Sequence, residues 1–98
     1  MTRELSPAVR DYLAADVKDL LWELYDAAPM KEQGMHMFQM VSADILRHTM
    51  LPLFLCEYEF SGRIPDLLDS TVLIVREDDT ETMLLESEYL GWLKEREK

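Results

Sequence analysis

Three side chains in the sequence carry an imidazole or a thiol that could bind a transition metal: His36, His48 and Cys56. Zinc sites use about four such ligands in tetrahedral geometry, usually in pairs that are two to four residues apart. These three residues are separated by 12 and 8 positions, so they form no such pair. Cys56 also falls on the apolar side of an alternating segment, where a thiol behaves as a small hydrophobe. The sequence therefore predicts no metal site and no cofactor.

Motifs for nucleophilic catalysis or phosphate binding do not occur either. A catalytic cysteine needs a neighbouring base and access to substrate, whereas the alternation places Cys56 in the core. There is no Gly-x-Ser-x-Gly sequence, and three glycines are too few for a phosphate-binding loop. Carboxylates are abundant, but a general acid also needs a pocket that shifts its pKa. We therefore expect a non-enzymatic protein, with a small enzyme of unrecognised class as an alternative.

Acidic residues are concentrated in residues 57–88. This segment holds ten of the twenty carboxylates and only two bases, within a chain of formal net charge −10. Such a field attracts basic partners. Six of these acids are expected on strands or on a turn between strands, and they are Glu57, Glu59, Glu77, Asp78, Asp79 and Glu81. Carboxylates held at fixed separations can imitate the phosphates of a nucleic acid. The sequence predicts a binding surface for a basic protein; the alternative is that these acids only keep the chain soluble.

Trp22 is a candidate anchor within such an interface. On a helix it points about 180° away from the middle of the apolar arc. Tryptophan and tyrosine dominate interface hot spots, so Trp22 could contact a partner or a second copy of the chain. The alternative is that another element of the same chain, such as the C-terminal helix, covers it.

Length and composition indicate one globular domain that spans residues 1–98. The chain has 48% hydrophobic and 31% charged residues, as ordinary globular proteins do. Its single cysteine excludes an internal disulfide. The sequence has no signal-peptide pattern and no apolar run of about 20 residues, so we expect a cytoplasmic protein without membrane contact. Ten bases scattered among twenty acids form no basic stripe, so direct nucleic-acid binding is not expected.

An N-terminal amphipathic helix is predicted to start after Ser6. The serine hydroxyl can cap free N–H groups, and Pro7 suits the first turn. Apolar residues then recur at helical spacing and fill an arc of roughly 120°. These residues are Val9, Leu13, Val17, Leu20, Leu21, Leu24 and Ala28. Pro29 ends the helix, because the residue before a proline is disfavoured in the helical region. The pattern leaves open whether residues 14–16 divide this helix into two.

The rest of the chain predicts a small sheet followed by a helix. Residues 35–41 are expected to form a strand, and residues 53–60 alternate between apolar and other side chains with a period of two. Residues 71–75 are apolar and β-branched, and a polar turn at 77–80 leads to a strand at 82–85. Ser87 can cap a C-terminal helix. The expected fold is α+β: a helix, three to four mostly antiparallel strands, and a helix.

Short motifs in the second half of the chain resemble a known family. Residues 75–79, 82–85 and 88–89 read VREDD, TMLL and EY, and near the N-terminus residues 21–26 read LWELYD. Residues 37–40, MFQM, stand where that family has a strand. The chain resembles the short bacterial and phage proteins grouped as domain of unknown function 960. The resemblance implies an α+β fold and transfers no activity or site, and the glycine usual in the acidic turn is absent.

The sequence as a whole favours a protein that acts by binding another macromolecule. The partner we expect is a basic, nucleic-acid-handling protein, and the phage-like resemblance is consistent with a mobile-element inhibitor of a host or defence nuclease. A self-associating structural module, which would form a homo-oligomer through a patch containing Trp22, is the alternative from another class.

Overall fold

The computed structural model describes residues 2–28, 35–42, 45–50, 54–59 and 71–96. In chain order its elements are β1 (Thr2–Leu5), α1 (Pro7–Tyr12), α2 (Ala15–Ala27), β2 (Met35–Met40), β3 (Ile45–Met50), β4 (Phe54–Glu59), β5 (Thr71–Glu77), β6 (Thr80–Leu85), the 3₁₀ helix η2 (Glu86–Glu88) and α3 (Tyr89–Arg96).

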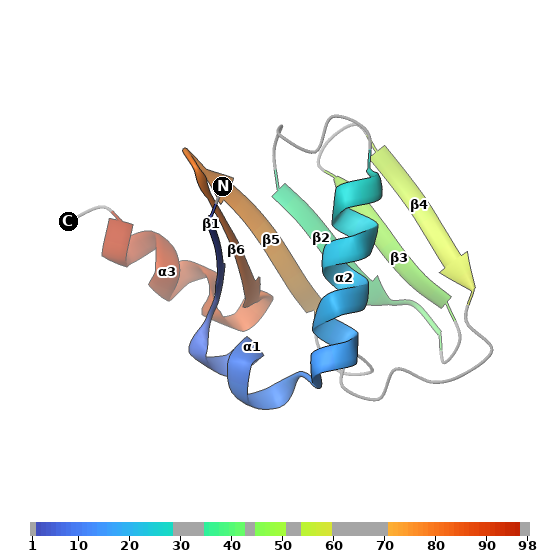
Figure 1. Ribbon diagram of the computed structural model, residues 1–98, viewed down its shortest axis with the longest axis horizontal. Coiled ribbons are helices and arrows are strands. Elements are labelled where there is room, and N and C mark those ends of the chain that lie inside the picture. The colour runs from blue at the N-terminus through green and yellow to red at the C-terminus, as the bar shows by residue number, and fades with distance from the viewer. Residues whose placement is uncertain (1, 29–34, 43–44, 51–53, 60–70, 97–98) are drawn as a thin grey trace.

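All six described strands belong to one mixed sheet. Its order is β1-β6-β5-β2-β3-β4. The β1 strand is parallel to β6, and the other neighbours are antiparallel. The hairpins β2–β3–β4 and β5–β6 therefore lie side by side, joined through β2 and β5 (Figure 1).

The predicted sheet of three to four mostly antiparallel strands is wrong. The sequence analysis missed β3 and β1, and β1 makes the sheet mixed. The β3 strand does alternate, with Leu46, His48 and Met50 buried between half-buried neighbours. The alternation is hidden in the sequence because a histidine stands at a core position. The β1 strand is four residues long and only its last residue is half-buried, so it has no apolar pattern to detect.

The N-terminal helical region consists of two helices, which answers the question that the sequence pattern left open. The Ser6 hydroxyl accepts a hydrogen bond from the Val9 amide and caps α1, as its sequence indicates. Leu13 and Ala14 then have extended ψ angles of 134° and 154°, which separates α1 from α2. Ala28 is extended before Pro29 and ends α2, as the sequence predicted.

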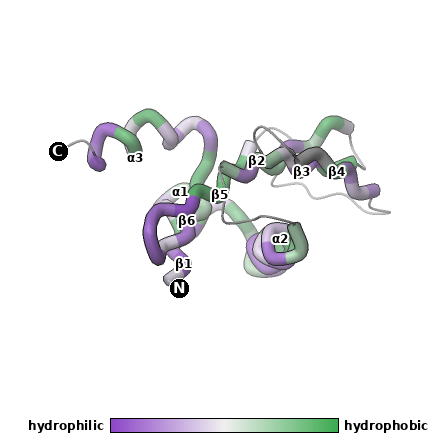
Figure 2. The backbone as a smooth tube through the Cα atoms, turned by 90° about the horizontal axis from the view of Figure 1, so that it is seen from above, coloured by the Kyte–Doolittle hydropathy of each residue, from purple (hydrophilic) through white to green (hydrophobic). Residues whose placement is uncertain are grey.

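The main core lies between α2 and one face of the sheet. In Figure 1, α2 crosses in front of the strands, and Figure 2 shows it on one side of them with α3 toward the other side. The buried cluster joins α1 and α2 to β2, β3, β5 and β6, and its members are Val9, Leu13, Val17, Leu21, Tyr25, Phe38, Leu46, Val72, Ile74 and Met83.

Helix α3 packs beside the other face, near β6 and β1. Strand alternation turns Leu84 and Thr82 of β6 away from the main core, and both are buried. The Arg96 guanidinium at the end of α3 bonds to Glu77 at the end of β5 at 3.0 Å. No helix among the described residues is long and apolar enough to cross a membrane.

Candidate functional site

The outer face of α2 carries four exposed carboxylates. Asp16, Asp19, Glu23 and Asp26 follow one another at spacings of three and four residues and fall within an arc of roughly 80°. The residues that α2 buries are on the opposite side. We call Asp16, Asp19, Glu23 and Asp26 the acidic α2 face. A helix anchored by its buried side holds these charges in fixed positions.

Three arginines of the described part of the chain are held in ion pairs. Arg3 pairs with Asp26 and with Glu81, Arg47 pairs with Glu57 at 2.9 Å, and Arg96 pairs with Glu77. Within the same residues, the carboxylates of Asp19 and Glu23 have no hydrogen bond or ion pair. The charges that remain available on the acidic α2 face are therefore negative.

The acids predicted to form one surface are placed in separate parts of the molecule. Glu57 and Glu59 lie on β4, at one edge of the sheet, with β2 and β3 between β4 and β5. Asp78 and Asp79 are exposed in the turn between β5 and β6, beside Glu77. Three strand spacings separate β4 from β5, which is about 14 Å across the sheet. Glu57 and Glu77 also lie toward opposite ends of the strands. Strand pairing places Glu57 in the same row across the sheet as Thr71, the first residue of β5, whereas Glu77 is the last residue of β5.

Glu81 does not belong to any surface, and its prediction as a binding residue is corrected here. Its exposed fraction is 2%, because β6 turns it toward α2. The Arg3 Nε donates to its carboxylate at 3.1 Å from the neighbouring strand. The alternation of β6 explains this placement, since Glu81 shares a face with buried Met83.

Trp22 lies half-buried beside the acidic α2 face. The Arg3 guanidinium carbon stands 4.4 Å from the centre of its ring, and the Tyr25 ring meets it edge to face at 5.9 Å. Trp22 also packs against the main core. Arg3 of β1, rather than the C-terminal helix, therefore covers its ring, and the residue as a whole remains partly accessible.

A line of buried polar side chains runs beneath α2. Glu81 forms a hydrogen bond with Tyr25, whose pKa is raised mainly by burial and further by this bond. The Tyr25 ring meets His36 edge to face at 4.6 Å, and Nδ1 of His36 lies 2.8 Å from Nε2 of His48. The His48 ring stacks on Phe38 at 4.2 Å. These side chains form one continuous cluster.

His36 and His48, which are 12 positions apart in the sequence, are thus hydrogen-bonded to each other. Burial, and then the charge of His36, lower the pKa of His48 to about 4, so its ring is neutral at pH 7. Cys56 stands opposite His48 on β4 but is only half-buried. The described residues contain no group of three or more ligands that could hold a metal ion. Because Tyr25, His36 and His48 are fully buried, no substrate atom can touch them in this conformation.

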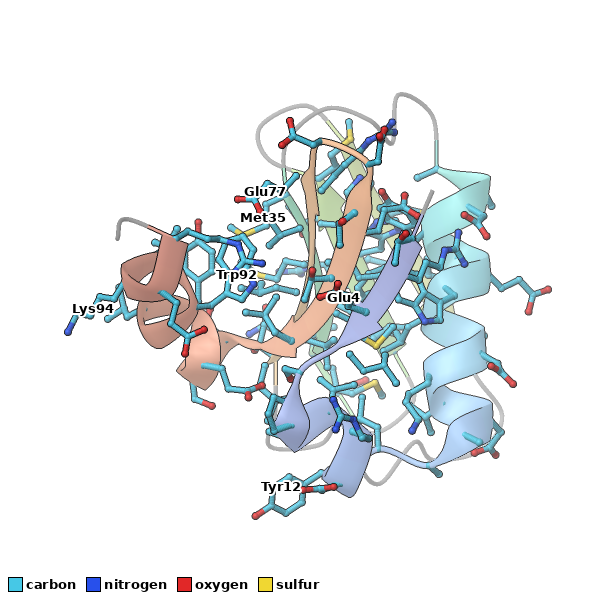
Figure 3. The ribbon with its side chains drawn as sticks, turned by 60° about the vertical axis from the view of Figure 1, so that its left-hand side comes forward. Glu4, Tyr12, Met35, Glu77, Trp92 and Lys94 are labelled. Carbon is cyan, nitrogen blue, oxygen red and sulfur yellow. The ribbon has the colours of Figure 1, made fainter. Side chains whose placement is uncertain are left out.

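A cavity of about 370 Å³ lies on the other side of the sheet, between α3 and the strands β1 and β6. Its walls come from Leu5, Pro7, Leu84 and Trp92, and its carboxylates are Glu4, Glu88 and Glu95. Figure 3 shows Trp92 between α3 and β6, with Glu4 on the adjacent β1.

The acidic α2 face and this cavity were both missed by the sequence analysis. The α2 face had a detectable signal in the three- and four-residue spacing of its acids, but residues 57–88 hold a larger number of acids in total. The cavity had no such signal in the sequence, because its lining residues come from both ends of the chain.

A protein of unknown function from Enterococcus faecalis, known from its crystal structure, has a similar fold. The two structures superpose with a TM-score of 0.72 over 89% of each chain, at 16% sequence identity. At this identity the likeness shows the fold alone. No protein-family model and no curated protein matches the sequence. The resemblance to domain of unknown function 960 stays a prediction.

Proposed function

We propose that the protein acts by binding a basic protein partner through the acidic α2 face, with the exposed part of Trp22 as an apolar contact at its border. The observation that carries this proposal is the pairing of charges. Arg3 of the neighbouring strand is engaged by Asp26 and Glu81, whereas the carboxylates of Asp19 and Glu23 are exposed and have no bond to any described residue. A cationic surface can therefore approach them without displacing an internal ion pair.

Charge spacing favours a protein interface over imitation of a DNA duplex. Asp16 and Asp26 are ten residues apart, about 15 Å along the helix axis. Four carboxylates over that length give about one charge per 4–5 Å, compared with one per about 1.7 Å in duplex DNA. The carboxylates of α2 are spaced too widely to imitate a DNA duplex. Their spacing suits contact with one basic patch or helix of a protein partner, such as a nucleic-acid-handling protein.

Two further acids, Asp78 and Asp79, lie toward the end of α2 that carries Asp26. The Thr2 amide donates to the Asp79 carbonyl at 2.8 Å, which fixes the β5–β6 turn beside β1. Arg3, on the same strand, contacts both Trp22 and Asp26 of α2. Asp78 and Asp79 thus add long-range attraction for a positively charged partner, while Glu57 and Glu59 lie away from this end.

The proposal is tested with a pair of variants of equal charge. Asp19→Asn with Glu23→Gln neutralises the acidic α2 face, and Glu59→Gln with Glu86→Gln neutralises exposed acids elsewhere. A partner captured from cells that encode the chain is purified, and its affinity is measured by calorimetry at 0.1 M and 1 M salt. Exposed charge pairs are each worth about 0.2–1 kcal/mol, so we expect a loss of about tenfold for the first variant and little change for the second.

Salt gives an independent reading of the same contact. The Debye length falls from about 10 Å at 0.1 M to about 3 Å at 1 M, so binding through exposed carboxylates weakens strongly. An affinity that is equal at both salt concentrations, or equal losses in the two variants, would refute the proposed interface. A chain that binds only a second copy of itself would favour the self-associating module instead.

A further inference from the structure

The cavity between α3 and the strands β1 and β6 is built differently from the acidic α2 face. Glu4, Thr82 and Leu84 line it from the strands, and Gly91 and Trp92 line it from α3. Its volume of about 370 Å³ is at the lower end of the range for small-ligand sites, roughly 300–1,000 Å³. It can hold one side chain or a short piece of polypeptide.

Two of its three carboxylates are available to a ligand. Glu88 accepts hydrogen bonds from the Ser6 hydroxyl at 2.5 Å and the Leu85 amide at 3.0 Å, so it is committed to joining η2 to the start of α1. The carboxylates of Glu4 and Glu95 are exposed and form no hydrogen bond or ion pair with any described residue. They supply negative charge in a cavity whose walls also include apolar side chains.

The bases of α3 do not neutralise this charge. Arg96 lines the cavity, but its guanidinium bonds to Glu77 and lies 3.7 Å from the centre of the Trp92 ring. Lys94 points away from the sheet (Figure 3). The cavity therefore combines walls of Pro7 and Leu84 with two unneutralised carboxylates.

We propose that this cavity receives the lysine side chain of a bound polypeptide. A lysine places its four-carbon stem along apolar surface and keeps its ammonium group in a polar environment. Here the stem contacts Pro7, Leu84 and Trp92, and the ammonium reaches Glu4 and Glu95. An arginine fits less well, because it gains from stacking on an aromatic face, and Arg96 already occupies a face of Trp92.

Gly91 offers a way to close the cavity without harming the fold. A Cβ atom added at Gly91 meets no atom within 4 Å. A larger side chain there has a higher helix propensity than glycine, so α3 is retained. Gly91→Leu is thus a blocking variant, and Glu4→Gln with Glu95→Gln is a charge variant at exposed positions.

The test uses three synthetic tripeptide probes with capped ends: glycine-lysine-glycine, glycine-arginine-glycine and glycine-norleucine-glycine. Binding is followed by NMR through the Gly91 amide and the Trp92 amide and indole N–H signals. We expect saturable shifts with the lysine probe and weaker ones with the other two. The charge variant should lower the affinity for the lysine probe about tenfold, and Gly91→Leu should abolish the shifts.

A matched control variant keeps the result interpretable. Asp19→Asn with Glu23→Gln changes the charge equally on the other side of the sheet and should leave lysine-probe binding intact, so this site and the proposed function can fail separately. Equal binding of the norleucine or arginine probe, unchanged binding by the charge variant, or no saturable shift with the lysine probe would each overturn the proposal.

Discussion

Acidification should destabilise this protein through its buried histidine pair. His48 has no exposed surface, and its ring lies between the Phe38 ring and the His36 imidazole. Among the described residues, Tyr25 of α2 and Cys56 of β4 are ionisable groups near the pair on this side of the sheet. Glu81 is bonded to Tyr25, and Tyr58 is bonded to Cys56. Burial of the ring, with a smaller contribution from His36, lowers the pKa of His48 from 6.5 to about 4. The unfolded chain therefore binds this proton more tightly than the folded chain.

The sign and the size of the effect follow from proton linkage. Between pH 6.5 and pH 4 the unfolded state holds more protons at this site, so the free energy of unfolding falls as the pH falls through this window. It changes little above pH 7 and levels off below pH 4. With a pKa of about 4 in the folded chain, the loss is about 2 kcal/mol between pH 7 and pH 5, and about 3 kcal/mol at pH 4.

Urea unfolding at pH 7 and pH 5 measures this loss, with His48→Gln as the control. A glutamine keeps a hydrogen-bonding partner for His36 but does not titrate. The control is needed because acidification also relieves repulsion in a chain of net charge −10, which stabilises the folded state. We expect the native chain to lose about 2 kcal/mol more than the variant. Equal losses in the two chains, or an NMR titration that places the His48 pKa near 6.5, would refute the reasoning.

Three further comparisons test the packing of the fold by urea unfolding. Phe38→Ala removes a fully buried ring and should cost about 3–5 kcal/mol, whereas Tyr12→Ala, at a side chain that is 74% exposed, should cost less than about 0.5 kcal/mol; similar costs would contradict the assigned core. Arg3→Ala leaves buried Glu81 without its guanidinium partner and should cost about 2 kcal/mol, most of which Glu81→Gln should restore in the double variant. Gly91→Ala should stabilise α3 by up to about 1 kcal/mol, because the new methyl group meets no atom within 4 Å. A loss of stability would contradict the open space assigned beside Gly91.

Local patterns predicted several elements well and missed others for identifiable reasons. The α1 cap at Ser6, the end of α2 before Pro29 and the polar turn after β5 follow from the chemistry of adjacent residues. The β1 strand could not be found in this way, because it pairs with β6, almost eighty residues later, and has few apolar side chains of its own. A strand of that kind is defined by its partner.

The candidate sites show the same division. His36 and His48 are far apart by the standards of metal-ligand motifs, but the β2–β3 hairpin places Phe38 opposite His48, so the two histidines become diagonal neighbours on one face. Sequence spacing measures distance along the chain, and antiparallel pairing makes residues adjacent when they are equally distant from a turn.

The sequence by itself determined the acidic character of the protein, the start of α1, the end of α2 and the strands that alternate clearly, because each depends on composition or on neighbours within a few residues. The tertiary structure alone decided that Glu81 is buried under Arg3, that Glu57 and Asp79 lie in separate regions, and that Glu4 and Trp92 share a cavity. These outcomes depend on strand order and on which face each strand turns to a helix. Both are fixed by burial of the whole apolar surface at once.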